Sequence, residues 1–225
     1  MTRFPGIRGV TFDVGGTLIA PHPSVGAVYA AVAAREGAPG LDAALLEARF
    51  RRAWDAGLPF AHTRAAWGAL VDDVFAGLVP APPTGNGLFA ALYAEFARPG
   101  AWRLCPGARE TLEALASEGY ALGVVSNWDE RLRPLLGALG LAGLFDVVVV
   151  SCETGFAKPS PVMFEVAARS LGLAPGQLLH VGDSAAEDVA GARAAGLAAW
   201  PAGPPPAGDG TLPHLLARMR ARRPD

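Results

Sequence analysis

The stretch from residue 8 to residue 18 constrains the fold more than any other part of the sequence. Apolar residues bounded by turn formers predict a short, buried strand that ends at Asp13. The pair Gly15-Gly16 then lets the backbone turn sharply and lie close to a bound group, because glycine has no Cβ. A carboxylate at the carboxyl end of a central strand lies where open α/β sheets bind their ligands. This stretch therefore predicts a functional site at Asp13, provided that basic and acidic partners follow.

The composition excludes several classes of protein. The 225 residues allow one or two domains with a sizeable core, and 51% hydrophobic with 18% charged residues is typical of a folded chain. The net charge of −2 argues against nucleic acid or a membrane as a partner. The two cysteines, Cys105 and Cys152, lack metal-ligand spacing, which favours two free thiols in a reducing compartment. The amino terminus has no apolar signal core and no run reaches the length of a membrane span, so we expect a cytoplasmic location.

Helical periodicity dominates between about residues 24 and 98, where apolar residues recur at helical spacing in four segments. Segments rich in proline and glycine at 37–40, 57–59 and 80–85 separate them. Four helices with short connections predict a bundle that can cover another domain, and we assign residues 21–99 to it. Its aromatic residues are expected to form mainly core.

Strands and helices alternate after residue 100. The predicted strands cover residues 120–126, 146–150, 178–182 and 197–200. This alternation predicts an α/β fold, a doubly wound parallel sheet, in which residues 1–20 and 100–225 form the core domain and the helical segment is an insertion. An exposed basic helix is expected near the end of the chain.

Polar residues stand at the predicted strand ends or in the loops beyond them: Asp13, Ser126, Lys158 and Asp183. Such loops converge on one edge of a parallel sheet, so these residues can meet there. Their chemistry suits phosphoryl transfer, with Asp13 as nucleophile and Asp183 as a ligand of a hard cation such as Mg²⁺. Ser126 and neighbouring backbone amides can bind phosphate oxygens, while Lys158 neutralises charge.

Four segments resemble the motifs of the haloacid dehalogenase-like (HAD) hydrolases in order and spacing. They are Phe12-Asp13-Val14-Gly15-Gly16-Thr17-Leu18, Val124-Val125-Ser126-Asn127, Lys158-Pro159 and the run from His180-Val181-Gly182-Asp183 to Asp188 and beyond. The segments 126–132 and 180–183 are similar to the subgroup of capped subfamily I named after a rhythmically expressed gene product. The resemblance implies a Rossmann-like core with an inserted helical cap, an aspartyl-phosphate intermediate and a small phosphorylated substrate. The oligomeric state is left open between a monomer and a homodimer.

The resemblance also implies roles for individual residues. Asp13, Lys158, Ser126 and Thr17 would be catalytic; Gly16, Ser126, Asn127 and Lys158 would bind the phosphoryl group; Asp13, the Gly15 carbonyl, Asp183 and Asp188 would hold Mg²⁺.

Several of these residues also have simple structural interpretations. Asp188 can equally stabilise the start of a helix. Thr17 can donate to Asp13 or cap the turn, and Glu187 is expected to be a solvated charge in a first helical turn. In the helical segment four residues could face a substrate, but residues of this kind are more often structural: His22, His62, Arg64 and Trp67.

One departure from the family pattern concerns Gly15, which stands where phosphatases carry the Asp that protonates the leaving group. Losing a general acid or base typically costs about 10²- to 10⁴-fold in rate. The departure leaves two alternatives open: a metal-independent 2-haloacid dehalogenase, and a weak or inactive protein that binds phosphorylated metabolites. Asp183 favours the Mg²⁺-dependent phosphohydrolase, because the dehalogenases do not normally keep an acid there. We expect Gly15→Asp to raise phosphatase activity if the cation site is intact.

Overall fold

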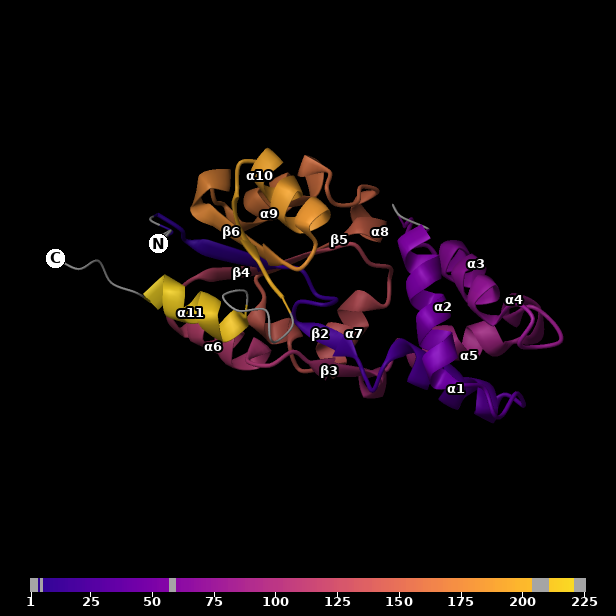
Figure 1. Cartoon of the computed structure of the whole chain (residues 1–225). Coiled ribbons are helices and arrows are strands. Elements are labelled where there is room, and N and C mark those ends of the chain that lie inside the picture. Colours follow the sequence, from indigo (N-terminus) through magenta and orange to yellow (C-terminus); the bar gives the residue numbers. More distant parts are fainter. Residues whose placement is uncertain (1–3, 5, 57–59, 204–210, 221–225) are drawn as a thin grey trace. The chain divides into compact units, whose positions relative to one another are not determined.

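A computed structural model describes residues 4, 6–56, 60–203 and 211–220 of the chain (Figure 1). The predicted connection at 57–59 and most of the proline-rich loop after Trp200 lie outside the described residues. The chain divides into two compact units, one made of residues 1–20 and 104–225 and the other of residues 21–103.

The first unit is built on a parallel sheet of five strands in the order β5-β4-β1-β6-β7. The strands are β1 (Gly9–Phe12), β4 (Ala121–Ser126), β5 (Val147–Val150), β6 (Leu178–Gly182) and β7 (Ala198–Pro201). Every ladder between neighbours is parallel, which confirms the predicted doubly wound sheet. The central strands are buried almost throughout, as their apolar sequences require.

Helices cover both faces of this sheet (Figure 1). On one side lie α9 (Pro161–Leu171) and α10 (Gly191–Ala194), and on the other α6 (Ala108–Ser117), α7 (Leu132–Ala138) and α11 (Leu212–Arg220). Shorter turns are α8 (Ser151–Thr154), η2 (Ala142–Leu144), η3 (Pro175–Gln177) and the π-helical η4 (Ala185–Ala190). The expectation of an exposed final helix was wrong in part, because Leu212 and Leu215 are buried where α11 packs against α6.

The second unit is helical. Its helices are α1 (Val25–Arg35), α2 (Ala43–Ala56), α3 (Arg64–Phe75), α4 (Pro83–Asn86) and α5 (Leu88–Glu95), followed by the turn η1 (Pro99–Ala101). The four predicted helices are present, and the single turn α4 was not expected within the proline-rich connection. The hydroxyl groups of Ser24 and Thr63 cap α1 and α3 by accepting backbone N–H groups. Aromatic side chains, Tyr29 and Phe75 among them, are buried in its core, as expected.

The two segments that join the units, β2 (Ile19–Pro21) and β3 (Trp102–Leu104), pair as a separate two-stranded sheet. Each has only three residues, too few for a periodic pattern to indicate them. Within the described part of the chain, no helix combines the length and apolar character that crossing a membrane requires.

Candidate active site

Three of the polar residues at strand ends meet at the carboxyl edge of the sheet. Asp13 directly follows β1, Ser126 is the last residue of β4 and Asp183 directly follows β6. Because β1 pairs in parallel with both β4 and β6, these ends lie side by side. Ser126 Oγ donates a hydrogen bond of 2.9 Å to Asp13 Oδ1. The sheet therefore places a hydroxyl group directly on the carboxylate of Asp13.

Lys158 lies buried between two carboxylates. Its Nζ donates to Asp13 Oδ1 at 2.7 Å and also to Asp188 Oδ1. Burial alone would lower the pKa of Lys158, but the charges of Asp13 and Asp188 outweigh it and raise the pKa above its usual range. Lys158 is therefore a fixed positive charge at the site.

Asn127 holds the backbone of Lys158 in place. Its Oδ1 accepts from the Lys158 N–H at 2.6 Å, and its Nδ2 donates to the Lys158 carbonyl at 3.0 Å. The same Nδ2 lies 3.1 Å from Glu187 Oε2. Glu187 is thus half-buried and bonded, and the expectation of a purely solvated charge was wrong because η4 turns this residue toward Asn127.

Three carboxylates form a cluster that can hold a metal ion: one oxygen each of Asp13, Asp183 and Asp188 lies within 4.8 Å of the others. With all three carboxylates ionised, as they would be around a cation, and Lys158 protonated, the local charge is −2, and all the side-chain donors facing a cation would be oxygens. Such a donor set fits a hard divalent cation such as Mg²⁺ and disfavours softer metals. The residues present therefore fit the cation that the fold family implies.

The electrostatics of the cluster differ between its members. Asp183 is exposed as a residue, yet the loss of water around its carboxyl group and the charges of Asp13 and Asp188 raise its pKa to about 7. Burial also raises the pKa of Asp13, against the opposing charge of Lys158. For Asp188, burial is outweighed by the hydrogen bond from His180 and the charge of Lys158, so its pKa is lowered. Asp183 therefore carries both a desolvation cost and the repulsion of two neighbouring carboxylates, and a bound cation would relieve both.

Two glycines make room for these carboxylates. Gly16 has φ +81°, and a Cβ at this position would overlap the Asp183 carboxyl group. A Cβ on Gly182 would overlap Asp188 in the same way. Thr17, in the turn after Gly16, donates to Asp183 Oδ1 at 3.3 Å, so its hydroxyl contacts a different carboxylate of the cluster from Asp13, one of the two partners considered for it from the sequence.

Three residues at the site had no role assigned to them from the sequence. Trp128 lies against Gly15: a Cβ on this glycine would stand 3.1 Å from Cζ3 of the indole ring. His180 and Thr11 lie beneath the carboxylates, where the imidazole bridges Thr11 and Asp188. A polar residue inside an otherwise apolar strand was the signal that could have indicated the last two.

Two of the candidates predicted in the helical unit have partners within that unit. In the helical unit His62 is buried and bonded to the Phe60 carbonyl, and the guanidinium of Arg64 stacks over Tyr93 at 4.4 Å. These contacts are those of packing residues. Cys105 and Cys152 form no disulfide, as expected.

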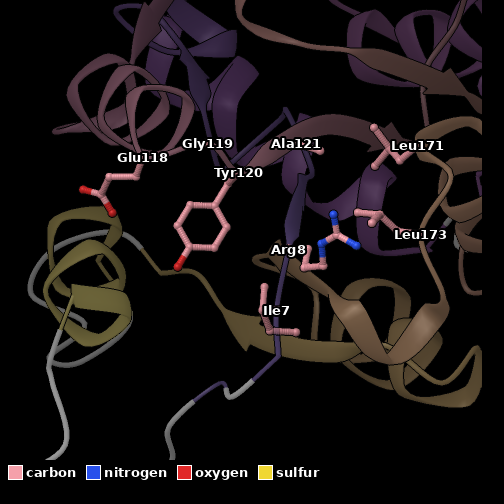
Figure 2. A pocket seen from close by; sticks show the side chains of 8 residues that line it. All are labelled: Ile7, Arg8, Glu118, Gly119, Tyr120, Ala121, Leu171 and Leu173. Carbon is pink, nitrogen blue, oxygen red and sulfur yellow. The ribbon is translucent and has the colours of Figure 1, made fainter.

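A surface depression of about 440 Å³ lies at the opposite edge of the sheet (Figure 2). It is lined by Ile7, Arg8, Glu118, Gly119, Tyr120, Ala121, Leu171 and Leu173. Residues 8 and 121 stand at the amino-terminal ends of β1 and β4. Parallel sheets of this kind bind their ligands beyond the carboxyl ends of the strands, so this depression is separate from the acidic cluster.

Comparisons with known proteins agree with this fold. The family model described as haloacid dehalogenase-like hydrolase matches residues 7–196. The chain is 35% identical over 202 residues to the human haloacid dehalogenase-like hydrolase domain-containing protein 3, covering 85% of this chain and 80% of the relative. It is 35% identical over 217 residues to the phosphoglycolate phosphatase of Escherichia coli K12, covering 87% of this chain and 81% of that enzyme. The crystal structure of an L-2-haloacid dehalogenase superposes with a TM-score of 0.69 at 28% identity, covering 96% of this chain and 99% of the other.

A parallel sheet with an acidic cluster and a buried lysine at its carboxyl edge, together with a family match over most of the chain, defines a hydrolase. The chain belongs to the haloacid dehalogenase-like hydrolase family.

Proposed function

We propose that this hydrolase is a phosphohydrolase that depends on a divalent cation, Mg²⁺ by the chemistry of its ligands, and acts on a small phosphorylated compound. The observation that carries the proposal is the cluster of Asp13, Asp183 and Asp188 around the ammonium group of Lys158. In the proposed role the three carboxylates and the Gly15 carbonyl would hold the cation. When bound, the cation would screen these carboxylates from an anionic substrate and withdraw electron density from phosphorus.

Asp13 is the proposed nucleophile. Both hydrogen bonds that its side chain accepts from described residues end on Oδ1, from Lys158 and from Ser126. They fix the carboxylate and leave the two lone pairs of Oδ2, one for an incoming phosphorus atom and one for a cation. Attack by Oδ2 would form an oxygen–phosphorus bond while the leaving oxygen departs with its electron pair; water then attacks phosphorus and releases phosphate and the Asp13 carboxylate.

Lys158 and Ser126 would stabilise the charge that develops on the transferring group. The lysine stays protonated because two carboxylates face it, so it can donate to a phosphoryl oxygen without changing its protonation state. Asn127 is proposed to orient this lysine through its side-chain hydrogen bonds to the Lys158 backbone. Asn127 and Gly16 are also proposed to contact the phosphoryl group. Thr17 would orient Asp183.

The helical unit of residues 21–103 is proposed to act as the cap that selects the substrate. Relatives of the chain include a phosphoglycolate phosphatase, which supports a small phosphorylated acid as the class of substrate. The proposed setting is the cytoplasm, with no nucleic acid or membrane as partner.

A second candidate function, 2-haloacid dehalogenase, is favoured by the contact between Gly15 and Trp128, because position 15 carries no acid and is bordered by an aromatic ring. The similarity to an L-2-haloacid dehalogenase also supports it. The carboxylates at 183 and 188 favour the phosphohydrolase. They can hold a cation that neutralises the charge of a phosphoryl group, whereas cleavage of a carbon–halogen bond needs no such cation.

The test compares two reactions on the same preparation. Phosphate release from p-nitrophenyl phosphate and from a panel of small phosphomonoesters is measured with Mg²⁺ and with EDTA, and halide release from L-2-chloropropionate is measured with EDTA. p-Nitrophenyl phosphate is included because its phenolate leaves without being protonated. Phosphate release that requires Mg²⁺ supports the proposal, whereas halide release in EDTA supports the dehalogenase. Thermal stabilisation by phosphate compounds with turnover of neither substrate contradicts both.

A further inference from the structure

A histidine lies beneath the acidic cluster in a strand that is otherwise apolar apart from its final glycine. His180 is the third residue of β6 and has no exposed surface. Its ring packs edge-on against Phe164, with 5.0 Å between ring centroids. Burying an imidazole in such surroundings costs free energy unless its hydrogen bonds are satisfied. Both ring nitrogens have a partner, and the two partners come from different segments of the chain.

The ring bridges β1 and the turn that carries Asp188. Nδ1 lies 2.9 Å from Thr11 Oγ1, and Nε2 lies 3.0 Å from Asp188 Oδ1. An ionised carboxylate can only accept hydrogen bonds, so Nε2 must carry a hydrogen in either protonation state of the ring. The hydroxyl of Thr11 can serve Nδ1 as donor or acceptor, and it fixes the plane of the ring.

The donors on Asp188 are divided unequally between its two oxygens. Oδ1 accepts from both Lys158 and His180, whereas Oδ2 accepts the backbone N–H of Ser184 at 2.9 Å. A carboxylate oxygen has two lone pairs, so Oδ1 is saturated and Oδ2 keeps one for a cation. The close approach of Asp188 to Gly182 leaves the carboxylate little room to shift along β6.

We propose that His180, oriented by Thr11, is a positioning residue that fixes the rotation of the Asp188 carboxylate. The fixed carboxylate would keep Oδ2 available to help hold the cation, and it keeps Lys158 in place between Asp188 and Asp13. This role rests on the proposed function, because it concerns the cation that the function requires. Without the imidazole, the carboxylate can rotate to share both oxygens with Lys158, and its contribution to cation binding falls.

The test measures Mn²⁺ binding, as a spectroscopic substitute for Mg²⁺, by three variants. His180→Leu keeps the bulk of the side chain and removes the donor, and His180→Gln can place an N–H near the position of Nε2. Phe164→Leu is the matched control, because it changes packing on the same imidazole without touching the hydrogen bond to Asp188. The dissociation constant is obtained by following free Mn²⁺ by electron paramagnetic resonance, and folding is checked by thermal denaturation.

We expect His180→Leu to weaken Mn²⁺ binding by about tenfold or more, in the range typical of residues that orient metal ligands. His180→Gln should recover most of that loss, and Phe164→Leu should lower the thermal midpoint with little change in affinity. Unchanged affinity in folded His180→Leu, or an equal loss in Phe164→Leu, would overturn the role of His180. A folded wild-type protein that binds no Mn²⁺ would instead remove the proposed function, and this role with it.

A second measurement does not require the cation. The ¹⁵N chemical shifts of the His180 ring report which nitrogen carries hydrogen, and we expect Nε2 to be the protonated one in the metal-free protein. Thr11→Val should broaden or shift the Nδ1 signal and weaken Mn²⁺ binding in the same direction as His180→Leu. A ring protonated on Nδ1 alone would overturn the proposal, because it could not donate to Asp188.

Discussion

Trp128 and Gly15 lie in contact beside the nucleophile: a β-carbon on Gly15 would stand 3.1 Å from Cζ3 of the indole ring. The place where related phosphatases carry an acid is therefore bordered by an aromatic ring. The indole ring can occupy this place because position 15 is a glycine. An aspartate at position 15 would require the ring to move by a few tenths of an ångström.

This contact changes the expectation for restoring the acid. We predict that Gly15→Asp alone gives only a small gain in phosphate release, since its carboxylate competes with the indole for space. The double variant Gly15→Asp/Trp128→Ala should gain more, up to the roughly 10²-fold that a positioned general acid contributes. Rates with p-nitrophenyl phosphate and with an alkyl phosphate measure this, because only the alkyl leaving group needs the proton.

Two control variants separate the effect of an acid at position 15 from the effect of the changed side-chain volumes. Gly15→Asn/Trp128→Ala has the same steric change without an acid, and Trp128→Ala alone removes the ring. If the variant with asparagine gains as much as the one with aspartate, the improvement is steric and the interpretation of position 15 as the acid position is wrong.

Lys158 is predicted to matter for both stability and turnover. Lys158→Met leaves Asp13 and Asp188 buried without their shared cation, and breaking a buried ion pair typically costs about 3–5 kcal/mol. We expect a loss of unfolding free energy of about that size in EDTA, and a loss of phosphatase activity of about 10²-fold or more. Chemical denaturation and phosphate release measure the two effects.

The control for this prediction is Arg169→Met, which removes an exposed pair with Glu165 and should cost under about 1 kcal/mol. Equal losses in the two variants would show that the buried position of Lys158 has no special energetic importance.

Asp183 should make the metal-free protein less stable as pH rises. Its pKa is raised to about 7 in the folded chain, whereas an aspartate in the unfolded chain titrates near about 4. Between these values the folded protein binds more protons than the unfolded one, so the unfolding free energy decreases as pH rises. His180, whose pKa is lowered by burial, acts in the opposite direction. Urea denaturation in EDTA at pH 5 and pH 8 of wild type and Asp183→Asn isolates the contribution of Asp183.

Because a cation must displace that proton, Mg²⁺ should raise the thermal midpoint of wild type more at pH 8 than at pH 6. The effect should shrink at high salt, since Asp183 is exposed and part of its shift comes from neighbouring charges. If Asp183→Asn shows the same pH profile as wild type, Asp183 does not titrate in this window.

Gly16 provides a test of the turn that follows the nucleophile. Gly16→Ala should lose about 1 kcal/mol or more from its positive φ, and it should also lose cation binding because its methyl group would displace Asp183. Gly37→Ala is a matched control, since Gly37 has φ +91° and no atom lies within 4 Å of the position of its Cβ. Denaturation measures the loss of stability in each variant, and Mn²⁺ titration measures the affinity for the cation. Equal Mn²⁺ affinities of Gly16→Ala and Gly37→Ala would show that glycine is needed at position 16 only for the backbone conformation.

The sequence indicated those parts of the site that stand at strand ends. Asp13, Ser126 and Asp183 could be placed because apolar strands precede them and parallel strands end at one edge. The sheet was predictable for the same reason, since its strands are buried runs separated by helices.

The remaining features depend on tertiary contacts that no local pattern records. The approach of Trp128 to Gly15 depends on a loop that hydrogen bonds between Trp128 and Ser151 hold in place. The π-helical form of η4 turns both Glu187 and Asp188 inward, where a regular first turn was expected to leave Glu187 in solvent. His180 was visible in the sequence as a polar residue within an apolar strand, but its partners become apparent only in the structure.

The most direct measurement for the central claim is the rate of Mg²⁺-dependent phosphate release from p-nitrophenyl phosphate by wild type and by Asp13→Asn, compared at matched thermal stability. If Asp13 attacks phosphorus beside a cation held with Asp183, wild type should be at least about 10²-fold faster and should lose its activity in EDTA. Equal rates for the two proteins, or a wild-type rate unaffected by EDTA, would contradict this account.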